Sequence, residues 1–374
     1  NAGKSNVIDS LRFLRDLAEG ANAVDARGGF SNIVWDGDIK RSIRMKMYGK
    51  LHMEESEKAY AYSLAIAGGP AHYGISNENF SVRVDGEERK LMVFPEKGDA
   101  AQFYDEKGKS LGGISAGREK SYLRHCESSH TPPALREFAR YVRGWGFYNI
   151  LPSKMRATQP TGKILRVKEN GENVSSVLHT LYVEHPAHFR EIEEDLKLAV
   201  DELKNLNVSL TEQGAIYGAI EEEGLTKKIP IWSMSDGTLH ILTYLSILDS
   251  PSPPPLICFE EPENYIHPHS LELLVHFMKK ASERTQILVT THSPYLLDFI
   301  DVGDIVVVEK HEGKTQIKYA RDEKGVRKAL EGIALGEMWF SGGLGGNPQI
   351  ADHIEPDRIT NTSFIEFQEK IKDP

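Results

Sequence analysis

Two glutamates come directly after a short apolar run in "PPLICFEEPENYIHP". The run Leu256 to Phe259 predicts a buried strand, and Glu260 and Glu261 stand where that strand ends. Ligands of open α/β sheets bind at the carboxyl ends of the strands. Paired acids there suit chemistry on phosphates, with Glu260 supporting Mg²⁺ and Glu261 polarising an attacking water. A surface turn after an edge strand explains this motif equally well when the motif is taken alone.

A second apolar run, in "TQILVTTHSP", ends in Thr291, His292 and Ser293. A lone histidine after a strand is usually an ordinary polar residue. Here it repeats the geometry of the glutamate pair, because two neighbouring strands would bring polar residues to one sheet edge. The repetition favours a site for the γ-phosphate of a nucleotide at that edge.

The stretch "IWSMSDGTLHILTYLSIL" places Ser235, Asp236 and Gly237 before a helix predicted over 238–248. Ser235 or Asp236 can cap this helix, and its first N–H groups with Gly237 form an anion site. By itself the motif fits an ordinary capped core helix better.

The chain opens "NAGKSN", and Gly3, Lys4 and Ser5 read as the closing half of the phosphate-binding pattern G-x-x-x-x-G-K-[ST]. Apolar residues at helical spacing over 5–17 predict the helix that such a loop requires. The opening half of the pattern is missing, so we expect further residues of the polypeptide to precede Asn1.

In this order the four motifs resemble those of ATP-binding-cassette ATPases of the SMC and RecF-like branch. They resemble in particular the compact bacterial AAA-type predicted ATPases, a group that includes ATPase subunits of some anti-phage systems and of overcoming-lysogenization-defect-type nucleases. The resemblance implies an α/β P-loop NTPase core, ABC ATPase-like, with an antiparallel β lobe and a helical lobe.

The resemblance also implies a mechanism shared by two subunits that pair head to tail around ATP and Mg²⁺, as a homodimer or a higher even oligomer. Nucleotide contacts are then expected from Ala2, Gly3, Lys4, Ser5 and Asn6, and in trans from Ser235, Asp236 and Gly237. Ser5 and Glu260 would hold Mg²⁺, Glu261 would act as the catalytic base, and His292 would sense the γ-phosphate. The usual Asp-Glu pair is here Glu-Glu, and Gln102 is poorly placed for the glutamine that usually links the lobes.

Other segments predict the supporting elements. Alternation over 41–104 predicts an antiparallel sheet with a hairpin at Asp85-Gly86. We expect a loop over 108–133, helices over 133–143, 188–206 and near 326–338, and a hairpin after Asp301. The expected parts are an N-terminal ATPase lobe (1–125), a helical lobe (126–230), the remaining ATPase core (231–310) and a C-terminal hairpin and tail (311–374).

Composition bounds the classes of protein. The chain has 374 residues, 40% of them hydrophobic, and a net charge of −10, so its surface is not basic throughout. Two cysteines provide no disulfide framework, and a reducing cytoplasm is the simplest location. No apolar run approaches the length of a membrane helix, and no signal peptide is visible.

Other groups of polar residues are weaker candidates for a metal site or a DNA contact. Asp352, His353, Glu355 and Asp357 fit a solvated polar turn better than a nuclease centre, and His125, Cys126 and His130 match no strong zinc pattern. Basic residues group over 40–50 and 153–168. Arg41 and Lys46 fall on opposite faces of one predicted strand, so DNA contact there is a weak hypothesis.

The leading interpretation is an ATPase that dimerises on ATP and controls DNA transactions or a partner nuclease, with anti-phage defence suggested by the family alone. The alternative is a nucleotide-binding scaffold with little turnover that assembles partner proteins. A transporter subunit is more distant, because its signature usually reads L-S-G-G-Q where this chain has "MSDGT".

Overall fold

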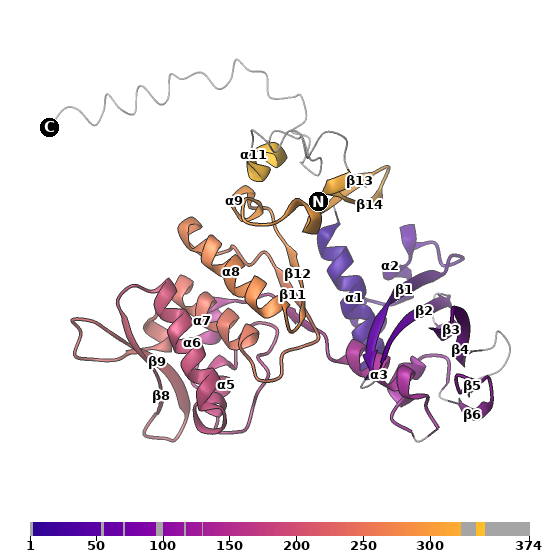
Figure 1. Ribbon diagram of the computed structural model, residues 1–374, viewed down its shortest axis with the longest axis horizontal. Helices are drawn as coiled ribbons and strands as arrows, with labels where there is room; N and C mark the ends of the chain where they lie inside the picture. The colour runs from indigo at the N-terminus through magenta and orange to yellow at the C-terminus, as the bar shows by residue number, and fades with distance from the viewer. Residues whose placement is uncertain are drawn as a thin grey trace, which may run out of the picture. The chain divides into compact units, whose positions relative to one another are not determined.

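A computed structural model describes residues 3–53, 56–69, 72–94, 100–115, 117–128, 130–322 and 334–340 (Figure 1). The chain forms two compact units. One comprises Ser5–Leu296, and the other combines Asn1–Lys4 with Leu297–Pro374. Among the described residues, no helix has the length and apolarity to cross a membrane.

The larger unit contains the expected antiparallel sheet, whose six strands lie in chain order. They are β1 Ile43–Met53, β2 Ser56–Gly68, β3 Tyr73–Val84, β4 Glu87–Val93, β5 Ala100–Tyr104 and β6 Ser110–Ser115. Asp85 and Gly86 both have positive φ in the tight turn between β3 and β4, which confirms the predicted hairpin. The predicted loop over 108–133 is wrong in its first part, because β6 pairs with β5 there. Two adjacent glycines in "SLGGIS" weaken the strand pattern of β6.

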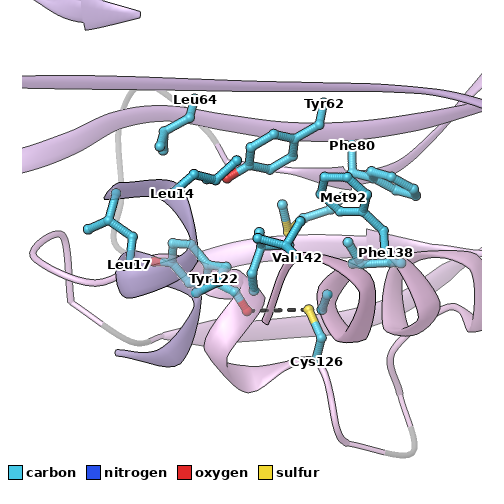
Figure 2. Packing of buried hydrophobic residues seen from close by; sticks show 14 of the residues in the cluster. Leu14, Leu17, Tyr62, Leu64, Phe80, Met92, Tyr122, Cys126, Phe138 and Val142 are labelled. Carbon is cyan, nitrogen blue, oxygen red and sulfur yellow. Dashed lines mark hydrogen bonds between the residues drawn. The ribbon is translucent and has the colours of Figure 1, made fainter. Parts of the chain in front are cut away.

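Two helices, α1 Lys4–Glu19 and α3 Pro133–Arg143, contribute to the apolar core beneath this sheet. The bounds of α3 agree with the prediction. Figure 2 shows Leu14 and Leu17 of α1 beside sheet residues such as Tyr62. The Phe138 ring of α3 lies with its centroid 5.0 Å from those of both Tyr62 and Phe80. Each large buried side chain contributes about 1.5–3 kcal/mol, so this core fixes the position of α1.

A small parallel sheet follows the order β12-β11-β7. Its strands are β7 Gly146–Tyr148, β11 Leu256–Glu260 and β12 Gln286–Thr290. Cys258 of β11 belongs to the core beneath the antiparallel sheet, while the Phe259 ring lies 5.0 Å from that of Tyr244 on helix α7, Asp236–Leu248. Both faces of β11 are therefore covered, which explains its uninterrupted apolar sequence.

Four further helices of this unit pack against α7: α4 Pro152–Met155, α5 Val174–Glu184, α6 Pro186–Ala199 and α8 Leu271–Ser282. Beside them lies a three-stranded antiparallel sheet of β8 Leu203–Leu210, β9 Ile216–Glu222 and β10 Ile229–Pro230. Two short helices are α2 Phe30–Ile33, whose Phe30 belongs to the core beneath the six-stranded sheet, and α9 Pro294–Leu297. The helix predicted over 188–206 ends early, because Leu203 begins β8 and pairs with Glu222. Leu203 is buried as the helical stripe suggested, but it is buried from a strand.

The smaller unit contains the predicted hairpin, formed by β13 Val306–His311 and β14 Lys314–Tyr319, and helix α11 Leu335–Phe340. Gly3 belongs to this unit and has φ 94°. A side chain at residue 3 would collide with the Thr315 hydroxyl, so only glycine fits against β14. Ala2, the acidic group at 352–357 and most of the helix predicted near 326–338 lie outside the described residues.

Candidate active site

The two glutamates and the histidine leave the parallel sheet at one edge. β11 and β12 run parallel in a register that places Glu260 beside Thr290. Glu261 therefore follows β11 at the same edge where Thr291 and His292 follow β12, as the sequence predicted. This edge lies at the carboxyl ends of the strands, where α/β sheets bind ligands.

The Glu261 side chain is held by polar groups of its own chain. Its backbone has φ 46°, an uncommon value for a residue other than glycine, and its N–H donates to the Thr290 carbonyl at 2.8 Å. Asn264 Nδ2 donates to Glu261 Oε2 at 3.2 Å, and His292 Nε2 lies 3.9 Å from Glu261 Oε1. The half-exposed carboxylate is thus directed by both neighbouring loops.

Glu263 joins the loop after β11 to the loop after β12. Its Oε1 accepts from the Thr291 hydroxyl at 2.6 Å and from the His292 N–H at 3.0 Å. Among the described residues, Glu263 Oε2 is buried without a hydrogen-bond partner. A buried carboxylate oxygen left in this state favours occupation by a donor or a cation at this point.

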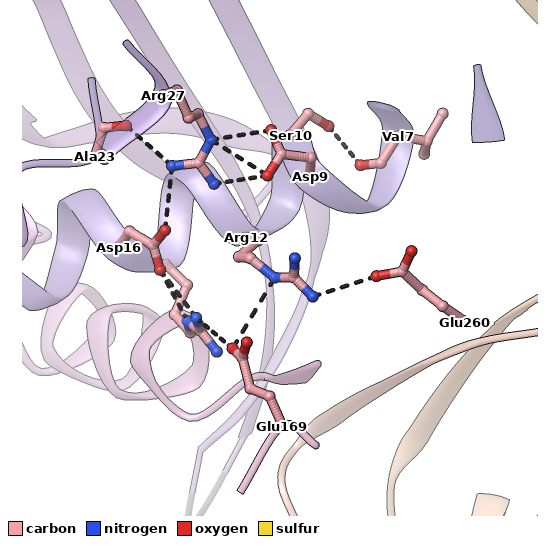
Figure 3. A network of polar contacts seen from close by, with 10 residues as sticks. Val7, Asp9, Ser10, Arg12, Asp16, Ala23, Arg27, Glu169 and Glu260 are labelled. Atoms are coloured by element: carbon pink, nitrogen blue, oxygen red, sulfur yellow. Dashed lines mark hydrogen bonds and ion pairs between the residues drawn. The ribbon is translucent and has the colours of Figure 1, made fainter. Parts of the chain in front are cut away.

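Glu260 contacts helix α1. Arg12 Nη2 donates to Glu260 Oε1 at 3.2 Å, and both side chains are about three-quarters buried. Figure 3 shows that Arg12 also approaches Glu169, which pairs with Arg15 at 3.0 Å. This chain of charges attaches α1 to the end of β11.

Ser5 and Asn6 lie in the first turn of α1, and both are exposed. Ser5 precedes Arg12 by seven positions, so the two residues share one face of the helix. The contact of Arg12 with Glu260 therefore turns the face that carries Ser5 toward the end of β11.

The signature helix α7 is capped as expected. Ser235 Oγ accepts from the Thr238 N–H at 3.1 Å, while Asp236 pairs with Arg156 at 2.5 Å. Every residue from Leu239 to Leu248 is buried, whereas Ser235 and Asp236 are exposed. The exposed helix start leaves its first N–H groups accessible to an anion.

Arg156 also donates to the Trp232 and Met234 carbonyls, both at 2.9 Å. Lys163, in the same basic stretch, pairs with Glu184 at 2.5 Å. These two residues of the stretch 153–168 are therefore engaged within the chain, which weakens the hypothesis that the stretch contacts DNA.

His240 connects α7 with the loop after Glu261. Its ring lies 5.1 Å from that of Tyr265, a residue with φ 65°. In the described part of the chain both ring nitrogens are buried without partners, and burial lowers the pKa of His240 to about 4. The histidine is therefore neutral near pH 7 and packs as an aromatic ring.

One protein family matches this chain, over residues 1–298, and its description is "AAA domain, putative AbiEii toxin, Type IV TA system". The chain belongs to this family. The AAA-type assignment made from the four motifs is thereby confirmed, and the chain is a P-loop ATPase domain by family. None of the curated proteins matches this AAA domain.

Solved structures similar to the AAA domain include heads of SMC proteins. One SMC head, bound to the C-winged helix domain of ScpA, is 12% identical, with a TM-score of 0.47 over 85% of this chain and 87% of that chain. Another, from Pyrococcus furiosus with an extended coiled coil and the C-terminal domain of ScpA, is 13% identical, with a TM-score of 0.44 over 88% and 91%. The family assignment rests on the sequence match.

The AAA domain also contains site residues that the sequence analysis missed. They are Arg12, Arg156, His240, Glu263 and Asn264. Glu263 and Asn264 stand inside the quoted run "FEEPENY", and Arg12 lies seven positions after Ser5, so spacing alone gave a signal for these three. Nothing local marks Arg156 or His240, whose contacts arise from folding.

The donor atoms fit Mg²⁺ bound together with a nucleotide. The described residues contain no group of three or more His, Cys, Asp or Glu side chains arranged for a metal ion. Mg²⁺ at phosphate sites needs only one or two protein oxygens, because phosphates and water supply the others. The Ser5 hydroxyl and the Glu260 carboxylate are oxygen donors of this kind.

Proposed function

We propose that this chain binds and hydrolyses ATP, dimerises around it, and uses the cycle to control DNA transactions or a partner nuclease. The observation that carries the proposal is Glu261, directed by Asn264 and His292 at the carboxyl edge of the parallel sheet. Membership of a P-loop ATPase family supports nucleotide as the substrate.

In the proposed reaction, Ala2, Gly3, Lys4, Ser5 and Asn6 bind the nucleotide phosphates. Ser5 and Glu260 would hold Mg²⁺ as its protein ligands, and the metal would supply neutralisation of charge on the phosphate oxygens. Glu261 orients the attacking water and accepts its proton, and His292 contacts the γ-phosphate. Because Glu263 binds the His292 N–H, it sets the position of this sensor. Positioning and electrostatics supply most of the rate enhancement.

Dimerisation is proposed because the start of α7 is exposed while the rest of the helix is buried. Arg156 fixes this start by binding Asp236 and two backbone carbonyls. Ser235 and Gly237 would then contact the γ-phosphate bound by the partner subunit. A two-fold pair closes two identical sites in this way.

The effector is proposed from the family alone. The family's description names a putative toxin of a type IV toxin–antitoxin system, which agrees with a role in defence. We place this role in a reducing cytoplasm, supported by Cys126 and Cys258, which are both free and buried.

Native mass spectrometry with ATP and Mg²⁺, beside an ATPase assay, tests the proposal on wild type and Glu261→Gln. Glu272→Gln is a matched control, since Glu272 is an exposed acid on α8. We expect turnover to fall at least a hundredfold in Glu261→Gln, while nucleotide stays bound in paired subunits; the control should match wild type.

The alternative function is a scaffold that binds nucleotide and assembles partner proteins with little turnover. Such a scaffold would be indifferent to loss of the Glu261 carboxylate. Unchanged binding, assembly and turnover in Glu261→Gln would therefore overturn the proposed active site.

A further inference from the structure

The outer face of the antiparallel sheet carries a row of basic residues on β1. Side chains of β1 alternate between the core and solvent, and those on the solvent side are Arg44, Lys46, Tyr48, Lys50 and His52. The sequence predicted Arg41 and Lys46 on opposite faces of one strand. This prediction was wrong, because β1 begins only at Ile43, after Arg41. The cations of β1 therefore share one face.

Beyond Glu57, which stands opposite His52 and pairs with Lys50, the strand beside β1 has small side chains on this face. Register places Lys46 opposite Ser63, Tyr48 opposite Ala61 and Lys50 opposite Ala59. The next strand, β3, presents longer polar side chains, because Asn77 stands opposite Ala65 and Asn79 opposite Ser63. The small residues of β2 thus form the floor of a channel with taller side chains on both sides, and Figure 1 shows the three strands side by side.

We call this channel the β2 trough. It consists of two adjoining hollows of about 500 and 490 Å³ that share Lys46 and Ser63. Its basic side chains are Arg44, Lys46, Arg83, Lys90 and Arg118, and its acidic side chain is Glu88, which accepts from the Ser81 hydroxyl at 2.7 Å. Five cations against one carboxylate contrast with the net charge of −10 of the chain.

The positive charge of the trough is little compensated by the protein. Within the described residues, Lys46, Arg83 and Lys90 form no ion pair, and Arg44 bonds only to the Ser42 hydroxyl. Like charges held this close repel one another unless a polyanion accompanies them. The trough is therefore electrostatically complementary to a phosphate backbone.

Tyr48 adds an aromatic surface to this charge. Its side chain is 72% exposed, and it stands on β1 between Lys46 and Lys50. Aromatic rings between basic residues bind unpaired bases by stacking, which contributes about 1–3 kcal/mol per base. The floor of the trough is one strand wide, with about 10 Å between β1 and β3, enough for a single nucleic-acid strand.

We propose that the β2 trough binds single-stranded nucleic acid, with phosphates on Lys46, Arg83 and Lys90 and a base on Tyr48. This proposal deepens the DNA arm of the proposed function. Binding in the trough requires no nucleotide, so it is measured without ATP and is separable from turnover.

Fluorescence anisotropy of the full chain with labelled 30-nucleotide oligo-dT, across a salt series, tests the proposal. The variant Lys46→Ala/Arg83→Ala/Lys90→Ala removes three phosphate contacts. Its matched control, Lys204→Ala/Lys227→Ala/Lys310→Ala, removes three exposed charges outside the trough and outside the stretch 153–168. We expect the trough variant to lose at least tenfold in affinity and its log–log salt slope to fall by about 2, since each contact contributes about 0.7.

Tyr48→Ala should lose fivefold or more with an unchanged salt slope, and Tyr48→Phe should retain binding. Circular dichroism and the ATPase rate verify that the variants fold. Two results would overturn the proposal. One is an equal loss of affinity in the trough variant and the control variant, and the other is tighter binding of a 30-base-pair duplex than of oligo-dT, with an affinity for the duplex that Tyr48→Ala does not change.

The two proposals fail separately. Loss of oligonucleotide binding with a normal ATPase rate in the trough variant supports the trough. Loss of ATPase activity with normal oligonucleotide binding in Glu261→Gln concerns the active site alone.

Discussion

Arg12 of α1 holds Glu260 at the end of β11, with 3.2 Å between Nη2 and Oε1. A residue proposed to bind Mg²⁺ is thus already paired with a cation that lies two helical turns after Ser5. In the proposed site the metal and the guanidinium would share one carboxylate, so we expect the affinity for Mg²⁺ to depend on Arg12.

Arg12→Ala should lower the half-saturating Mg²⁺ concentration for ATPase activity about threefold to tenfold, because the metal no longer competes with a charged hydrogen bond. The effect is limited because both side chains are partly solvated. Arg27→Ala is the control: Arg27 belongs to the same network through Asp9 and Asp16 but does not contact Glu260 (Figure 3). A Mg²⁺ titration in which both variants behave like wild type would exclude this role.

Glu263→Ala should lower kcat at least tenfold and leave KM for ATP within about twofold. The substitution releases the Thr291 hydroxyl and the His292 N–H, so His292 loses its position while the phosphate loop is untouched. Glu263→Gln keeps an acceptor oxygen and should restore kcat to within about threefold of wild type. If Glu263 only stabilises the fold, both variants should have a lower melting temperature in thermal denaturation, and kcat should not fall separately from KM.

Arg156→Ala should weaken ATP-dependent pairing of subunits about tenfold or more. Arg156 binds Asp236 and two carbonyls beside the signature, and hydrogen bonds from a charged donor contribute about 1.5–3 kcal/mol each when well shielded. Sedimentation in the Glu261→Gln background with ATP measures the effect, and neighbouring Lys154→Ala is the control. If Arg156→Ala pairs as well as wild type, the start of α7 that Arg156 holds does not contribute to pairing of the subunits.

His240 should make stability fall as pH falls. Burial lowers its pKa to about 4 against an ordinary value near 6.5, so between these values only the unfolded chain binds the proton. Stability contributed by the neutral ring is complete above pH 6.5 and is lost toward pH 4. Asp236 attracts a proton to the ring, and Tyr244 and Tyr265 pack against it.

Urea denaturation of wild type and His240→Phe isolates this effect. The stability of wild type relative to the variant should drop by about 2 kcal/mol between pH 7.5 and 4.5. The comparison with the variant is needed because burial raises the pKa of Asp249 to about 6, which acts in the opposite direction in both proteins. Parallel pH profiles of the two proteins would show that His240 does not titrate in this window.

The sequence predicted correctly those helices and strands that show a clear local pattern of apolar residues. The apolar runs of β11 and β12 and the helix Pro133–Arg143 are of this kind. The prediction failed where two patterns overlap, as at Leu203, or where glycines interrupt a strand, as in β6.

The site shows the same division. The sequence brought Glu260, Glu261 and His292 to one edge, because parallel strands end together. The contacts of Arg156 with Asp236 and of His240 with Tyr265 could not be predicted from the sequence, since they join segments that are distant along the chain. The roles assigned to the nucleotide-binding residues remain predictions for the experiments above.

The contact between Gly3 and Thr315 has a consequence for synthesis on the ribosome. Gly3 leaves the ribosome long before the β14 strand against which it packs, because the two lie far apart along the chain. At about 5–20 residues per second, the delay is roughly 15 to 60 seconds. Thr315 also lies beyond residue 298, where the family match ends. A nascent chain that already contains the four ATPase motifs therefore still lacks the packing around Gly3.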